Sequence, residues 1–298
     1  MASAVLNATF ALTERYVSSS DGTQIFAQAV GKPHLPTLVF VHGFALSALV
    51  QWANIFRDTN LLRYFHLVAY DLRGFGRSGK PEREADYSSK LCADDFVSVT
   101  KSFNVTKPLF IGWSLGGTYA SDVLQHYGPD ALSGIIWTAA CPYLAAAPNC
   151  TTTWVKTTEL PAISSVDNAT LALSIRQEFL YRLFNHPAKV PTEVLWSWLG
   201  STMLPDPAKI TFPAGPARGS TQDTTNLFEA GKKGVPLLLI NGGADGSIKG
   251  EETHAIVKGK WKDLTVYTAK NGSHAFFYEE QEEYVAQVLR FGRRVFKV

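Results

Sequence analysis

Short runs of apolar residues, separated by helix-like stretches, are the feature that most limits how this chain can fold. The runs are Thr37–Val41, His66–Tyr70, Pro108–Ile111, Gly134–Thr138, Pro236–Ile240 and Leu264–Thr268. Strands that are apolar on both faces are typical of a parallel sheet buried between helices. Helix-like segments alternate with them: Val50–Leu62, Ser88–Phe103, Leu115–Tyr127, Glu251–Val257 and Glu280–Val295. This alternation predicts an α/β fold with a doubly wound, mostly parallel sheet.

The segment before the first apolar run has a different pattern. Two β-like stretches, Glu14–Ser19 and Gln24–Val30, are separated by the turn residues Asp21-Gly22. Two short strands joined by such a turn pair as an antiparallel hairpin. We therefore expect a hairpin at the start of the sheet.

One interval, 141–234, is too long to be an ordinary connection between two strands. It contains the helix-like segments Leu171–Phe184 and Val194–Leu204 and is rich in aromatic residues, before a return rich in Pro and Gly over Pro205–Gly219. We interpret it as a helical cap inserted over the carboxyl edge of the sheet. The predicted division is a core domain of residues 1–140 and 235–298, interrupted by a cap of residues 141–234.

The sequence Gly112-Trp113-Ser114-Leu115-Gly116 lies between an apolar run and a helix-like segment. Gly-x-Ser-x-Gly at a junction from strand to helix is the pattern of a nucleophile elbow, in which a serine occupies a sharp, strained turn. The glycines are needed because strand and helix converge there and leave no room for side chains. Ser114 is therefore the candidate nucleophile.

A serine nucleophile needs a base, and the base needs a group that orients it. His274 follows the last predicted strand, and Asp245 follows the run Pro236–Ile240. Both are expected at the carboxyl ends of parallel strands, the edge at which open α/β sheets bind ligands. The order Ser114, Asp245, His274 is that of the nucleophile-elbow fold. We predict that these three residues form a catalytic triad.

Acyl transfer also needs two N–H donors that stabilise the oxyanion. The backbone N–H of Leu115, directly after the nucleophile, is one candidate. The loop His42-Gly43-Phe44 closes the first buried strand, and the Phe44 N–H is the second candidate. We expect His42 to hold this loop by side-chain hydrogen bonds rather than to act as a base. We interpret the stretch 71–79 as a structural loop in which Asp71 and Arg73 position the backbone.

Composition argues against several classes of function. The chain of 298 residues holds 28 Lys and Arg against 26 Asp and Glu, which gives a formal net charge of +2. Binding to nucleic acid or to an anionic membrane depends on a concentrated basic surface, which this balance does not favour. No run approaches the ~20 apolar residues of a transmembrane helix. No Cys/His cluster has the spacing of a zinc site.

The cysteines and the first residues bear on the compartment. Three cysteines, Cys92, Cys141 and Cys150, cannot all pair with one another, which favours a reducing environment. The stretch Met1–Leu12 lacks the basic region and the long apolar region of a signal peptide. We therefore expect a cytoplasmic protein.

These segments together resemble the α/β-hydrolase fold family, and within it the capped esterases, lactonases and C–C-bond hydrolases. The resemblance covers nearly the whole chain, is weakest over 141–234, and is carried by His42-Gly43-Phe44, the stretch 71–78, Gly112–Gly117, Asp245 and His274. It implies an eight-stranded sheet, a Ser–His–Asp triad, an oxyanion hole and no cofactor. Members with an aspartate nucleophile, the epoxide hydrolases and haloalkane dehalogenases, differ from this chain at Ser114.

We therefore expect a serine hydrolase that cleaves a small-molecule carboxylic ester or lactone of uncharged or apolar character. The side chains expected to line its substrate site are Phe44, Trp113, Trp154, Phe179, Trp196 and Trp198. Two alternatives stay open, because one fold and one triad host many functions. The first is a C–C-bond hydrolase, lyase or perhydrolase that uses the same triad. The second is a ligand receptor with slow turnover. The sequence predicts no oligomeric state.

Overall fold

The computed structural model describes residues 11–298, so most of the stretch Met1–Leu12 lies outside the described part of the chain. Within the described residues, eight strands form one sheet in the order β1-β2-β4-β3-β5-β6-β7-β8. The strands are β1 Thr13–Ser18, β2 Gln24–Val30, β3 Thr37–Val41, β4 His66–Tyr70, β5 Leu109–Trp113, β6 Gly134–Thr138, β7 Leu237–Gly242 and β8 Leu264–Ala269. The pairs β1–β2 and β2–β4 are antiparallel, and every later pair is parallel. The predicted α/β sheet and its opening hairpin are confirmed.

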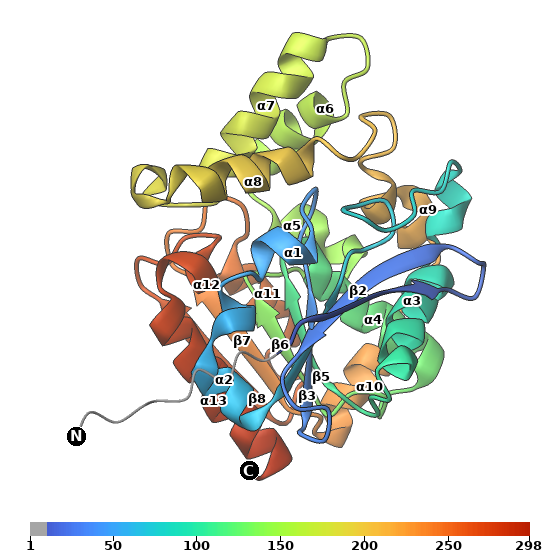
Figure 1. The fold of residues 1–298 in the computed structure, drawn as a ribbon, viewed down its shortest axis with the longest axis vertical. Coiled ribbons are helices and arrows are strands. Elements are labelled where there is room, and N and C mark those ends of the chain that lie inside the picture. The colour runs from blue at the N-terminus through green and yellow to red at the C-terminus, as the bar shows by residue number, and fades with distance from the viewer. Residues whose placement is uncertain (1–10) are drawn as a thin grey trace.

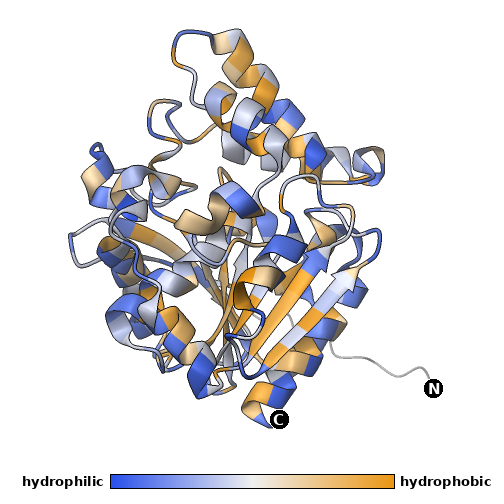
Figure 2. Cartoon of the chain, turned by 180° about the vertical axis from the view of Figure 1, so that it is seen from behind, coloured by the Kyte–Doolittle hydropathy of each residue, from blue (hydrophilic) through white to orange (hydrophobic). Residues whose placement is uncertain are grey.

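The central strands are apolar because both of their faces are covered. Every residue of β3, β4, β5 and β6 is buried, whereas the edge strand β1 is almost entirely exposed. Figure 2 shows these central strands as a hydrophobic interior, with helices that carry polar residues on their outer sides. This difference explains why the inner strands are continuous apolar runs and β1 is not.

Helices cover the two faces of the sheet (Figure 1). Helices α2 (Thr59–Tyr64) and α13 (Gln281–Phe296) pack together on one face, and α3 (Ser89–Ser102) packs with α4 (Tyr119–Tyr127) on the other. Three further helices outside the interval 141–234 are α1 Ala48–Gln51, α11 Gly250–Val257 and α12 Phe276–Glu279. Within residues 11–298, no helix combines the length and the apolar character needed to cross a membrane.

The predicted helix Val50–Leu62 is wrong in its continuity. The structure divides this region into α1, a 3-10 turn at Ile55–Arg57 and α2. The Asn54 side chain accepts a hydrogen bond from the N–H of Ile55, and Asp58 Oδ1 accepts from the N–H groups of Asn60 and Leu61. Asn and Asp side chains compete in this way for backbone donors and start new helices. Two such residues therefore interrupt what the apolar pattern presents as one helix.

The interval 141–234 contains several helices and crosses the carboxyl edge of the sheet. Its elements include α5 Ala147–Cys150, the π-helical turn Val155–Glu159, α6 Leu160–Ile163, α7 Ala169–Arg182, α8 Thr192–Thr202 and α9 Pro216–Gly219. In Figure 1, α6, α7 and α8 lie above the sheet at the top of the molecule. The division into core and cap stays a prediction.

The last helix of this interval, α10 (Thr225–Lys233), lies lower in the molecule. It packs against α4 beside the sheet, and Asn226 Nδ2 donates to the carbonyl oxygen of Leu124 at 3.0 Å. This helix therefore covers a face of the sheet instead of its edge, although the predicted cap includes it. Its packing partner lies about 100 residues earlier in the chain, so no local pattern identifies it.

Candidate active site

The residues predicted to act chemically follow strands that end at the same edge of the sheet. Phe44 comes after β3, Ser114 after β5, Asp245 after β7 and His274 after β8. The strands β3, β5, β6, β7 and β8 are successive parallel neighbours. Carboxyl ends of parallel strands meet at one edge, so residues up to 230 positions apart are brought to one place.

Ser114 lies on a strained turn. Its φ angle is 53°, in the left-handed region that non-glycine residues rarely adopt. The flanking glycines are required by close contact: a Cβ atom on Gly112 would lie 2.6 Å from Gly117 Cα, and one on Gly116 would lie 2.5 Å from the carbonyl oxygen of Val41. The motif therefore forms the tight strand-to-helix junction that its glycines predict.

His274 and Asp245 are in direct contact. Nδ1 of His274 lies 2.8 Å from Oδ2 of Asp245, and each side chain is only 2% exposed. The other carboxylate oxygen of Asp245 accepts hydrogen bonds from the N–H groups of Ser247 and Ile248, at 2.7 and 2.9 Å. These bonds hold the carboxylate in place. A proton on Nδ1 leaves Nε2 with a free lone pair, which is the form that a general base needs.

The His274 loop is also tied to the nucleophile strand. Trp113 Nε1 donates to the carbonyl oxygen of His274 at 2.8 Å, and the two rings lie 4.7 Å apart between centroids. This contact joins the residue directly before Ser114 to the imidazole-bearing loop. The two loops therefore keep a fixed relative position.

His42 holds the loop after β3. Its Nε2 accepts a hydrogen bond from the N–H of Leu72 at 2.9 Å, so Nδ1 carries the proton and donates to the carbonyl oxygen of Gly43 at 2.7 Å. Complete burial lowers the pKa of His42 and keeps the ring neutral. Both ring nitrogens are thus occupied by backbone groups, which confirms that His42 braces the loop.

The loop after β4 supports the same edge. Asp71 accepts hydrogen bonds from the N–H groups of Ala48 and Arg77, both at 2.8 Å. Arg73 is fully buried and pairs with Asp95 of α3, with Nη2 2.6 Å from Oδ1. Asp71 therefore positions backbone beside the site, as predicted, and Arg73 anchors the loop to α3.

The Phe44 N–H is available for an additional acceptor. Phe44 is 8% exposed, and within residues 11–298 its N–H donates to no backbone carbonyl. Its neighbour Ala45 has a φ angle of 57°, a strained conformation that turns the chain sharply after β3. Buried N–H groups are almost always paired. An unpaired N–H on a residue that shares a cavity with Ser114 has the property expected of an oxyanion donor.

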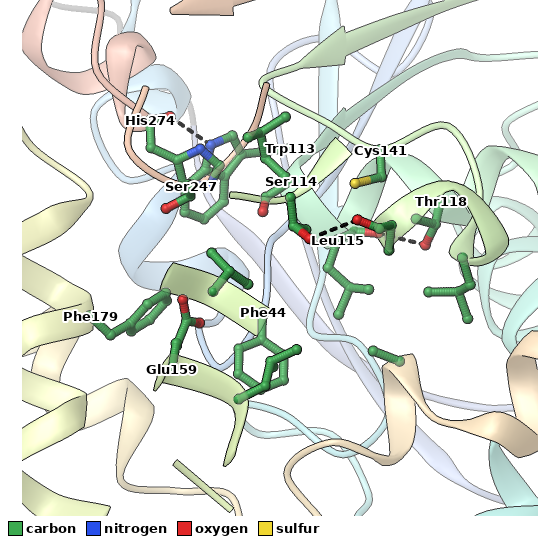
Figure 3. A pocket seen from close by; sticks show the side chains of 17 residues that line it. Phe44, Trp113, Ser114, Leu115, Thr118, Cys141, Glu159, Phe179, Ser247 and His274 are labelled. Carbon is green, nitrogen blue, oxygen red and sulfur yellow. Dashed lines mark hydrogen bonds between the residues drawn. The ribbon is translucent and has the colours of Figure 1, made fainter. Parts of the chain in front are cut away.

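A cavity of about 150 Å³ that is open to solvent lies beside these residues (Figure 3). Both Ser114 and His274 line it, which brings the candidate nucleophile and base to one space. Of the other residues predicted to contact substrate or oxyanion, the cavity is lined by Phe44, Trp113, Leu115 and Phe179. Most of its wall is apolar.

Three tryptophans predicted to line the substrate site do not line this cavity. Trp196 is 71% exposed on the outer side of α8. Trp198 is buried but packs against Trp113 and Phe277 in the core. The guanidinium group of Arg182 covers the ring of Trp154, with the guanidinium carbon 4.3 Å from the ring centroid. Packing determines which face of each helix in the interval 141–234 meets the cavity, and aromatic content alone does not indicate that face.

The cavity wall also holds one acidic residue that was not predicted from the sequence. Glu159, the last residue of the π-helical turn, is 3% exposed and lines the cavity. Burial raises the pKa of its carboxyl group to about 8. No spacing or motif marks this glutamate in the sequence. Within residues 11–298, no group of three His, Cys, Asp or Glu side chains is arranged to hold a metal ion.

Similarity to known proteins shows the family to which this chain belongs. A family model described as the alpha/beta hydrolase fold matches residues 36–281. The chain belongs to the α/β hydrolase fold family. The match extends from the segment before β3 to the start of α13, so it includes all the candidate site residues.

Three known proteins are similar to this chain over most of their length. The AB hydrolase superfamily protein YisY of Bacillus subtilis is 25% identical over 280 residues, which cover 93% of this chain and 98% of that protein. The bifunctional esterase/perhydrolase DCH of Acinetobacter calcoaceticus is 28% identical over 263 residues, covering 82% and 88% of the two chains. The crystal structure of the esterase RhEst1 from Rhodococcus sp. ECU1013 matches with a TM-score of 0.77 at 22% identity, over 93% and 98%.

Proposed function

We propose that this α/β hydrolase is a serine hydrolase that cleaves a carboxylic ester or lactone through an acyl-enzyme. The proposal rests mainly on one observation. Ser114, on its strained turn, lines the same cavity as His274, whose Nδ1 is hydrogen-bonded to Asp245. The esterase activity named for the Acinetobacter and Rhodococcus relatives supports the choice of an ester substrate.

In the proposed first step, Ser114 Oγ attacks the carbonyl carbon while Nε2 of His274 takes its proton. Asp245 keeps the imidazole oriented and stabilises its charged form. The N–H groups of Phe44 and Leu115 donate to the oxyanion of the tetrahedral intermediate. As the intermediate collapses, the bond to the leaving alcohol breaks and His274 returns the proton to that oxygen.

In the second step, water attacks the acyl-enzyme, and His274 accepts one of its protons. The bond to Ser114 Oγ then breaks, the serine regains its proton, and a carboxylic acid leaves the site. For a lactone, the alcohol and the acid stay on one molecule, which departs as a hydroxy acid. The apolar wall of the cavity favours an uncharged acyl group.

One alternative has support from a relative's name. The Acinetobacter protein is described as both an esterase and a perhydrolase. In that reaction, hydrogen peroxide replaces water as the group that attacks the acyl-enzyme, and a peracid leaves instead of an acid. Esterase and perhydrolase activity share every step up to the acyl-enzyme, so product analysis with and without peroxide separates them.

A fluorophosphonate probe and a panel of aryl esters test the proposal. Wild-type protein is expected to be labelled on Ser114 and to hydrolyse some of the esters. Ser114→Ala should lose labelling and lower kcat by at least about 10³-fold. Unlabelled wild-type protein, or ester turnover unchanged in Ser114→Ala, would exclude the mechanism. If the probe labels Ser114 but unlabelled protein hydrolyses an ester only about once in minutes, the protein would be a receptor. Product release without incorporation of oxygen from labelled water would indicate a lyase.

A further inference from the structure

A buried carboxyl group faces the cavity across from the candidate triad. Glu159 ends the π-helical turn Val155–Glu159, and Figure 3 shows its carboxyl group turned into the cavity, on the far side from Ser114 and His274. In this turn, Val155 and Glu159 are buried and line the cavity, while the three residues between them are exposed. The turn therefore points one apolar and one ionisable side chain inward.

No protein group satisfies this carboxyl. Within residues 11–298, no side chain or backbone donor forms a hydrogen bond with it, and burial is the main influence on its pKa. The positive charge that opposes the effect of burial, Arg182, is engaged elsewhere: its Nε donates to Glu178 at 2.8 Å and its guanidinium covers the Trp154 ring. The carboxyl oxygens are not among the fully enclosed unpaired atoms of residues 11–298, because they open onto the cavity. A carboxyl group without a protein partner that faces an open cavity is available to a ligand.

Among the described residues that line the cavity, Glu159 is the only one with a carboxyl group. Leu160 and Phe179, which also line the cavity from the same region, are apolar. Because burial raises its pKa to about 8, the carboxyl is mostly protonated near neutral pH. A neutral carboxyl offers one acceptor oxygen and one O–H donor. A secondary amide, with one N–H and one C=O, matches both.

We propose that Glu159 is a specificity-determining residue that hydrogen-bonds an N–H or O–H group on the acyl part of the substrate, away from the reacting carbonyl. This inference rests on the proposed function for the identity of the reacting end. The substrate class is then an ester or lactone whose acyl chain is apolar next to the carbonyl and carries an amide or hydroxyl group farther along. A purely aliphatic acyl chain would leave Glu159 unpaired.

The kinetic test uses matched pairs of para-nitrophenyl esters. One member carries an acetamido group at the end of an alkanoyl chain, and its partner is the ketone in which CH₂ replaces the N–H. Chains of increasing length are compared, and the readout is the ratio of kcat/KM for amide over ketone. The ratio is expected to fall about 10- to 100-fold in Glu159→Leu and to remain near the wild-type value in Glu159→Gln.

Two controls separate recognition from general damage. Glu193→Leu removes an exposed carboxylate from α8 of the same region and should leave the ratio unchanged. Esters that end in a trimethylammonium group carry charge but no N–H. A preference for these esters alone that depends on Glu159 would overturn hydrogen-bond recognition in favour of charge. A ratio that changes less than about threefold in Glu159→Leu, at every chain length, would also overturn the proposal.

A binding measurement keeps this inference separate from the hydrolase proposal. Methyl ketones with the same two kinds of chain cannot be hydrolysed, and calorimetry measures their affinities for wild-type, Glu159→Leu and Glu159→Gln protein. The methyl ketone whose chain carries the amide should bind about tenfold more tightly to wild-type protein and to Glu159→Gln than to Glu159→Leu. Such a pattern without ester turnover would exclude the proposed function and keep the subsite. Equal affinities alongside active ester turnover would exclude the subsite alone.

Discussion

His274 Nδ1 lies 2.8 Å from Asp245 Oδ2, although the two residues follow different strands, β8 and β7. The carboxylate is held in turn by the N–H groups of Ser247 and Ile248. The loops after these two neighbouring parallel strands thus share one buried contact. This contact determines which ring nitrogen of His274 is protonated.

Asp245→Asn should therefore impair catalysis much more than folding. The amide keeps the size of the side chain but donates towards Nδ1, which favours the wrong tautomer of His274. We expect kcat for an aryl ester to fall about 10³- to 10⁴-fold with a Tm within a few degrees of wild type. The measurements are steady-state kinetics and calorimetric melting. An activity within tenfold of wild type would mean that Asp245 does not orient the base.

Gly116→Ala should prevent the nucleophile turn from forming. The added Cβ would lie 2.5 Å from the carbonyl oxygen of Val41, where only a backbone shift makes room. Loss of soluble folded protein, or a Tm lower by at least about 5 °C together with loss of activity, is expected. Gly200→Ala is the matched control, because nothing lies within 4 Å of its Cβ position in helix α8. That substitution should stabilise the protein by about 0.5–1 kcal/mol, and the same Tm loss in both variants would contradict the explanation.

The buried pair Arg218–Asp122 should respond differently to single and double substitution. Both side chains are fully buried, and Arg218 also donates to Thr118 Oγ1 at 2.8 Å, beside the nucleophile turn. Arg218→Met leaves the Asp122 carboxylate without its partner and should destabilise the fold by about 3–5 kcal/mol in urea unfolding. Adding Asp122→Leu should recover part of this loss. Strictly additive losses would show that the two charges do not compensate one another.

Glu159 should make stability depend on pH. Its carboxyl has a pKa of about 8 in the folded protein against 4.5 ordinarily, because burial outweighs the opposing charge of Arg182. Between these values the folded state holds a proton that the unfolded chain has released, so the free energy of unfolding falls as pH rises from about 4.5 to about 8. Glu159→Gln lacks this loss. Its stability relative to wild type should grow by about 1–3 kcal/mol between pH 5 and pH 8 in urea titrations, and parallel curves would contradict the burial argument.

The sequence by itself determined the sheet and the order of the candidate site residues. Each central strand is a continuous apolar run, and Gly112 and Gly116 mark the turn at Ser114. These signals are local, since burial on both faces and close contact at a turn leave their mark on adjacent residues. The position of Asp245 and His274 after such runs then implied a shared edge. The pairing of the two side chains needed coordinates.

Tertiary structure alone decided what surrounds that edge. Trp196 faces solvent and Trp198 packs into the core, whereas Glu159, without any motif, faces the cavity. In the region over the sheet, the side of each helix that meets the cavity depends on contacts with segments distant in the chain. Residue type and helical spacing do not encode that rotation, because an aromatic side chain gains as much from burial against another helix as from lining a cavity.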